Sequence, residues 1–122
     1  MTWRTCFSDE ARDWFAKAAR AKGTDANRAE TRFREVLTKR LEPYVPFGAE
    51  SAQVTKIQDD LWELRRDSYR LFFGFVPGRS RVIIVSNVLP KKSGRLPQRV
   101  YDQESRRLAT LMDRAVKWTL EC

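Results

Sequence analysis

The chain has 122 residues and no histidine, and its 24 basic and 16 acidic residues leave a formal net charge of +8. This length fits one domain over residues 1–122, and the missing histidine excludes His-based catalytic triads and His-containing zinc sites. The sequence has no apolar run long enough to cross a membrane and no signal peptide, so it predicts a cytoplasmic protein whose positive excess favours a polyanionic or acidic partner.

The N-terminal third predicts a short strand and two helices. Residues 2–6 form the strand, and Ser8 then fits the N-cap of a helix that Gly23 ends. A second helix begins at residues 24–25 and stops at Pro43. Apolar residues recur every three or four positions on one side of both helices, so we expect those sides to lie in the core.

The chain contains two cysteines, Cys6 and Cys122. A disulfide framework usually has several cysteines at organised spacings. We therefore expect both cysteines to be reduced thiols.

The rest of the chain predicts a sheet and a final helix. β-forming runs separated by turns indicate strands at residues 53–57, 61–66, 69–76 and 81–89. Pro97 suits the first position of a helix that continues to about residue 120. We therefore expect an α+β fold in which two N-terminal helices pack on a mainly antiparallel sheet of four to five strands, with a C-terminal helix packed against it.

Turn lengths predict how the strands pair. A two-residue loop at residues 67–68 places Arg65 opposite Arg70. A four-residue loop at residues 77–80 places Arg70 opposite Asn87, so that the three side chains form one row across the sheet.

Strand side chains alternate between the two faces of a sheet. One face is then core and carries Trp62, Leu64, Tyr69, Leu71, Phe73, Phe75, Val82 and Ile84. The opposite face carries Glu63, Arg65, Arg70, Phe72, Val85 and Asn87. Because two facing arginines repel, this face needs a nearby carboxylate or an anionic ligand, and Glu63 is the candidate carboxylate.

The stretch "LPKKSGRLP" at residues 89–97 follows the last strand and brings three more cations to the edge of this face. Lys91, Lys92 and Arg95 offer the donors that bind phosphate, and the next helix adds backbone N–H groups at its N-terminus. The alternative is a solvated turn without a ligand.

Three segments together resemble the HigB-like branch of the RelE/ParE toxin superfamily. They are "LWELRRDSYRLFFGF" at residues 61–75, the apolar strand that follows, and "KKSGRLP" at residues 91–97. The resemblance covers about residues 54–115, and two features depart from it: many members have a histidine near Asn87, and Leu96 replaces the usual threonine. The residues that match the pattern are Glu63, Leu64, Arg65, Tyr69, Arg70, Lys91, Lys92 and Pro97.

This resemblance implies the toxin of a type II toxin–antitoxin system. Such toxins cleave mRNA, usually on the ribosome, without a metal or other cofactor, and pair with an antitoxin that often has a helix-turn-helix domain. The ribose 2′-OH attacks the adjacent phosphate, which gives a 2′,3′-cyclic phosphate and a free 5′-OH. The general base is Glu63 if it is free of its arginines, or otherwise a lysine. The implied catalytic residues are Glu63, Arg65, Arg70 and Lys92, and the implied RNA-binding residues are Asn87, Lys91, Lys92, Arg95 and Tyr101.

Two other functions fit the same sequence. A relative in the ParE branch acts on gyrase and needs no catalytic geometry. A non-catalytic basic relative binds RNA without cleaving it. A buried structural role remains an alternative for Tyr101.

Overall fold

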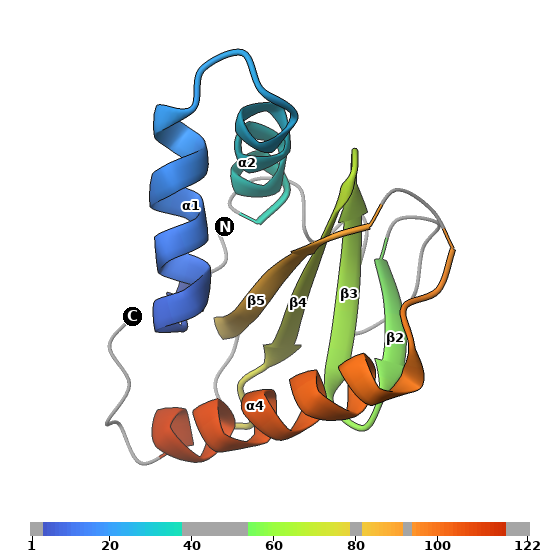
Figure 1. Ribbon diagram of the computed structural model, residues 1–122. Coiled ribbons are helices and arrows are strands. Elements are labelled where there is room, and N and C mark those ends of the chain that lie inside the picture. Colours follow the sequence, from blue (N-terminus) through green and yellow to red (C-terminus); the bar gives the residue numbers. More distant parts are fainter. Residues whose placement is uncertain (1–3, 38–53, 79–81, 92–93, 117–122) are drawn as a thin grey trace.

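The computed structural model describes residues 4–37, 54–78, 82–91 and 94–116. Five strands form one sheet in the order β1-β5-β4-β3-β2. β1 runs parallel to β5 and the other neighbours are antiparallel, which confirms the predicted α+β fold (Figure 1). The elements are β1 (Arg4–Phe7), α1 (Asp9–Arg20), α2 (Asp25–Glu35), β2 (Val54–Gln58), β3 (Leu61–Arg66), β4 (Tyr69–Phe75), β5 (Val82–Pro90) and α4 (Gln98–Val116).

The first two helices begin at the caps that the sequence predicts. The Ser8 hydroxyl accepts a hydrogen bond from the Ala11 N–H at 3.0 Å, and Thr24 caps α2 in the same way. Ser8 also donates to the carbonyl of Ser86 in β5 at 2.6 Å, so the start of α1 is held against the sheet. Pro43, the predicted end of the second helix, lies outside the described residues.

The C-terminal helix starts one residue later than predicted. Pro97 precedes α4, and its carbonyl accepts the Val100 N–H at 2.9 Å. α4 is described as far as Val116, so its predicted end near residue 120 lies outside the described part. None of the helices in the described ranges is apolar and long enough to span a bilayer.

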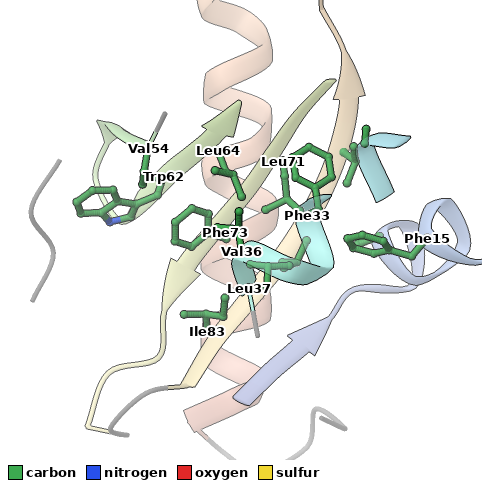
Figure 2. Close-up of a cluster of buried hydrophobic side chains, with 14 residues drawn as sticks. Phe15, Phe33, Val36, Leu37, Val54, Trp62, Leu64, Leu71, Phe73 and Ile83 are labelled. Atoms are coloured by element: carbon green, nitrogen blue, oxygen red, sulfur yellow. The ribbon is translucent and has the colours of Figure 1, made fainter. Parts of the chain in front are cut away.

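One face of the sheet packs against α1 and α2 and forms what we call the α1/α2-side core (Figure 2). Aromatic rings meet edge to face there, as at Phe15 and Phe33, whose centroids are 6.5 Å apart. The cluster is entirely apolar, so burial of hydrophobic surface holds the N-terminal helices to the sheet. Its buried members are Ala11, Phe15, Ala29, Phe33, Val36, Leu37, Val54, Trp62, Leu64, Leu71, Phe73, Ile83, Val85 and Val88.

The other face packs against α4 and forms the α4-side core (Figure 1). The helix lies very close to β4 at Gly74, where an added Cβ would come within 2.6 Å of Met112 and 2.9 Å of the Asp60 carbonyl oxygen. A glycine is therefore required for this approach. The buried members of this core are Cys6, Leu61, Phe72, Val76, Val82, Ile84, Tyr101, Leu108, Leu111, Met112 and Ala115.

The predicted register is right for one hairpin and wrong for the next. Arg65 pairs with Arg70 as expected, whereas Arg70 lies opposite Leu89 and Asn87 lies opposite Phe72. Two shifts of one residue add up to this difference. Next to the turn, Phe75 pairs with Ile83 instead of the predicted Val82, and further along Phe72 pairs with Asn87 but Phe73 with Val85, so Ser86 is an extra residue in β5.

The shift next to the turn reverses the predicted faces of the first half of β5, and the bulge at Ser86 then returns Asn87 to its predicted face. Val82 and Ile84 were expected in the core under the N-terminal helices, but they face α4. Val85 was expected on the opposite face, but it belongs to the α1/α2-side core together with Ile83. A single extra residue shifts the alternation of side chains by one, which exchanges the two faces.

The prediction of two reduced thiols is wrong for Cys6. This residue in β1 is fully buried and disulfide-bonded. Cys122, the other cysteine of the chain, lies outside the described residues.

Candidate functional site

A buried carboxylate lies at the centre of the candidate site. Glu63, in the middle of β3, is 1% exposed. One of its oxygens accepts hydrogen bonds from Arg65 Nε at 2.9 Å and from Arg70 Nη1 at 3.4 Å. Its other oxygen accepts the Tyr101 hydroxyl at 3.4 Å. Glu63 is thus the carboxylate that offsets the repulsion between the two facing arginines, as the sequence predicts.

Arg70 is the buried arginine of the pair and holds the connector between β5 and α4. Only 3% of the residue is exposed, although the sequence placed it in a row of cations. Its Nε donates to the Lys91 carbonyl and its Nη2 to the Gly94 carbonyl, each at 3.2 Å. Together with the Glu63 contact, these bonds engage all three nitrogens of the guanidinium, so Arg70 holds the backbone of Lys91 and of Gly94.

Arg65 is the exposed arginine of the pair. Its side chain is 45% exposed, and only its Nε donates to Glu63. Its two terminal nitrogens have no partner within the described ranges. Glu63 therefore orients a guanidinium whose outer edge remains available to an anion.

Tyr101 is buried in the first turns of α4 and does not reach solvent. It is 1% exposed, its hydroxyl accepts the Leu96 N–H at 3.2 Å, and its ring meets Phe72 edge to face at 6.1 Å. This is the structural role that the sequence left open. Any effect of Tyr101 on RNA binding must act through the residues it supports.

The remaining predicted residues lie at different distances from Glu63 along the sheet and connector. Lys91 is half-buried, and its N–H donates to the Ser68 carbonyl at 2.8 Å. Arg95 is exposed, and Lys92 lies outside the described residues. Asn87 is half-buried in the neighbouring row, where its amide donates to Glu104 of α4 at 3.0 Å. The register shift next to the turn and the bulge at Ser86 together account for this position.

Charge on this face of the sheet is positive. Four basic residues, Arg65 and Arg70 on β3 and β4 and Lys91 and Arg95 in the connector, outnumber the nearby carboxylates of Glu63, Asp102 and Glu104. Such an excess attracts an anion, and planar guanidinium groups suit the tetrahedral oxygens of phosphate. Across the described part of the chain, no group of three or more side chains is placed to hold a metal ion.

A polar network beside Arg95 was not predicted from the sequence. The Gln98 amide donates to Gln58 Oε1 at 2.6 Å and to Asp102 Oδ1 at 2.9 Å, and Gln58 also donates to Asp102 at 3.0 Å. Hydrogen bonds from Gln58 and Gln98 lower the pKa of Asp102 below its ordinary value. The spacing of Gln98 and Asp102 along one helix was visible in the sequence. The hydrogen bonds with Gln58 of β2 depend on the tertiary structure.

Comparison with known proteins finds little that resembles the chain. No family model matches the sequence, and no curated protein matches it. Among solved structures, a chain of the toxin–antitoxin complex RelBE2 from Mycobacterium tuberculosis is similar, with a TM-score of 0.49 and 14% sequence identity. The similar region covers 75% of this chain and 100% of that chain. We assign neither family nor function from a likeness of this size.

Proposed function

We propose that this protein is the toxin of a type II toxin–antitoxin system and cleaves mRNA as a metal-independent endoribonuclease on the ribosome. One observation carries the proposal. Arg65 of β3 and Arg70 of β4, which match the toxin pattern, both bond the buried carboxylate of Glu63, and Arg70 also bonds two carbonyls of the connector. This arrangement leaves a charged guanidinium at the surface, next to a cationic connector.

The proposed reaction is an in-line transfer of the phosphoryl group. The 2′ oxygen of one ribose forms a bond to the adjacent phosphorus while the bond from phosphorus to the 5′ oxygen breaks. The 2′-OH gives its proton to a base, and the leaving 5′ oxygen takes up a proton. The enzyme must hold the phosphate in line and stabilise the negative charge that develops on it.

Each cation has a role that follows from its contacts. Arg65 contacts the scissile phosphate, because its terminal nitrogens face solvent while Glu63 fixes its orientation. Lys91 and Arg95 bind the flanking backbone. Arg70 is a positioning residue, since its donors are engaged by Glu63 and by the carbonyls of the connector.

The condition for Glu63 to act as the base is not met. Both of its oxygens already accept hydrogen bonds, and two of these bonds come from arginines, so Glu63 is not free of its arginines. Proton abstraction therefore falls to a lysine of the connector, and Lys92 is the candidate from the sequence.

The proposed partners follow from the same function. They are mRNA, the ribosome and a cognate antitoxin with a helix-turn-helix domain, all met in the cytoplasm. The positive face described above suits both RNA and an acidic segment of the antitoxin.

The test is cleavage by the purified protein. Ribosomes carrying a defined mRNA are incubated with the protein in EDTA, and the new RNA ends are mapped and their chemistry determined. We expect 5′-OH and 2′,3′-cyclic phosphate ends. Arg65→Ala should lower the cleavage rate about 100-fold, the usual cost of removing one group that stabilises transition-state charge. Arg12→Ala, an exposed arginine of α1, is the control and should cleave normally.

Two other results would contradict the proposal. Intact RNA together with arrested supercoiling by gyrase would indicate a ParE-like toxin. Binding of RNA with no cleavage, with or without ribosomes, would indicate a non-catalytic RNA-binding protein.

A further inference from the structure

Arg95 is held by two contacts although its side chain is exposed. Its guanidinium lies over the ring of Tyr101, with Cζ 4.7 Å from the ring centroid. Its Nη2 donates to Gln98 Oε1 at 3.0 Å. An exposed arginine is normally free to rotate and loses side-chain entropy when it is fixed. The two directed contacts of Arg95 therefore indicate that the orientation of its guanidinium matters for function.

The groups that hold Arg95 are themselves fixed. Gln98 is bonded to Gln58 of β2 and to Asp102 one turn further along α4. Tyr101 is buried, with its hydroxyl between Glu63 and the Leu96 N–H, so its ring has no room to swing outward. The guanidinium plane of Arg95 is thus set by a rigid ring on one side and by an anchored amide at its edge.

The same buried pair supports both surface arginines. Glu63 orients Arg65, and Tyr101, bonded to Glu63, supports Arg95. The in-plane nitrogens of Arg65 suit a phosphate. In Arg95 one in-plane nitrogen is used by Gln98, and the flat face of the guanidinium opposite Tyr101 can be offered in addition to its other N–H groups.

We propose that Arg95 is a nucleobase platform, on which a base next to the phosphate held by Arg65 stacks against the guanidinium face that Tyr101 leaves open. Arginine planes and aromatic rings both stack with bases that are splayed out of a single strand. The site would therefore bind one nucleotide through two of its parts, the phosphate at Arg65 and the base at Arg95. This inference rests on the proposed function, because it requires RNA as the ligand.

The test measures the contribution of the bases to RNA affinity separately from that of the phosphates. Two labelled RNA oligomers of five nucleotides carry 2′-O-methyl groups throughout and cannot be cleaved. One has all its bases, and the other has the same phosphates with abasic sugars. Their dissociation constants are measured by fluorescence anisotropy for the wild type, for Arg95→Lys, and for Arg99→Lys as a matched exposed control on α4.

We expect the wild type to bind the oligomer with bases at least about fivefold more tightly than the abasic oligomer, the low end of the effect of stacking one base. Arg95→Lys keeps the charge but loses the plane, so it should lower this preference at least about fivefold and leave the affinity for the abasic oligomer nearly unchanged. Arg99→Lys should behave as the wild type. Thermal unfolding of each variant checks that the fold is retained.

Four outcomes would overturn the inference. A preference for bases that Arg95→Lys leaves intact would place stacking elsewhere. Equal binding of the two oligomers by the wild type, or an equal loss for both in Arg95→Lys, would make Arg95 a phosphate contact only. If the wild type binds neither oligomer nor ribosomes, the proposed RNA function fails and the platform fails with it.

Discussion

The two faces of the sheet are each covered by helices, but they are built from different chemistry. The α1/α2-side core is apolar throughout (Figure 2). The α4-side core is apolar where Leu108 and Met112 approach Gly74, and it is charged at its other end, where Glu63 and Arg70 are buried beside Tyr101. One covered face therefore holds the fold together, and the other holds a set of charges in place.

This difference shows how a small domain places cations that would repel one another. A buried ion pair contributes little net stability, because removing both groups from water costs about as much as their attraction returns. What the pair provides is a defined geometry. Arg70 fixes the carbonyls of the connector and Glu63 fixes Arg65, while the apolar face opposite supplies the free energy of folding.

The largest effect on stability should come from the apolar face. Phe73→Ala removes a fully buried ring from the α1/α2-side core and should lower the free energy of unfolding by about 3–5 kcal/mol, measured by urea denaturation. The neighbouring Phe72→Ala should destabilise to a similar extent, but Phe72 contacts Tyr101 on the other face. Under conditions where both variants are folded, only Phe72→Ala should weaken RNA binding. An equal loss of RNA binding in both variants would show that the two faces of the sheet do not differ in their effect on RNA binding.

Substitution of the two facing arginines should have opposite effects: one mainly on stability and the other mainly on cleavage. Arg70→Ala leaves Glu63 short of its buried partner and two connector carbonyls without a donor, so we expect a loss of about 3 kcal/mol in unfolding free energy. Arg65→Ala removes a half-exposed partner and should cost less than about 1 kcal/mol, yet it should abolish most of the cleavage. Urea denaturation and the cleavage assay together test this pair. An Arg70→Ala variant as stable as the wild type would mean that the buried contacts do not hold the connector.

The close approach of α4 to β4 should give an intermediate effect. Gly74→Ala places a methyl group within 3 Å of Met112, Leu108 and the Asp60 carbonyl, and should lower stability by about 1–3 kcal/mol. Met112→Ala in the same chain makes room at the flexible contact. The double variant should therefore lose less stability than the sum of the two single losses. Additive losses would show that the Asp60 carbonyl, and not Met112, limits the approach.

The smallest effect should be a pH-dependent one at the junction of α1 and α4. A backbone hydrogen bond in the first turn of α1 lowers the pKa of Glu10, burial opposes this change, and Arg107, at 2.8 Å, lowers the pKa further. Because the pKa is lower in the folded state, Glu10 stabilises the protein at pH values above the ordinary pKa of a glutamate. This contribution disappears as the pH falls through the lowered pKa.

Glu10→Gln should therefore reduce stability at pH 7 by less than about 1 kcal/mol, since the pair is largely exposed. At pH 3 the difference from the wild type should be smaller. Urea denaturation at the two pH values measures it, and a larger difference in acid would reverse the assigned sign.

The sequence by itself determined the elements and one of the registers. Ser8 and Thr24 cap their helices as predicted because capping depends on the few residues that follow. Arg65 lies opposite Arg70 because a two-residue turn leaves little freedom in the pairing next to it. Glu63 was found as their carboxylate because side chains two positions apart in a strand share a face.

Only the tertiary structure decided which of these residues reach the surface. The bulge at Ser86 is held by a hydrogen bond from Ser8, 78 positions away in the chain, and no local pattern in β5 signals it. Arg70 and Tyr101 are buried because α4 and the connector cover their end of the sheet. Of the two arginines in the predicted row of cations, Arg65 is therefore exposed, whereas Arg70 is buried and holds the connector. Turns and caps depend on neighbours in sequence, whereas burial depends on what packs above a residue, and that is decided only when distant segments meet.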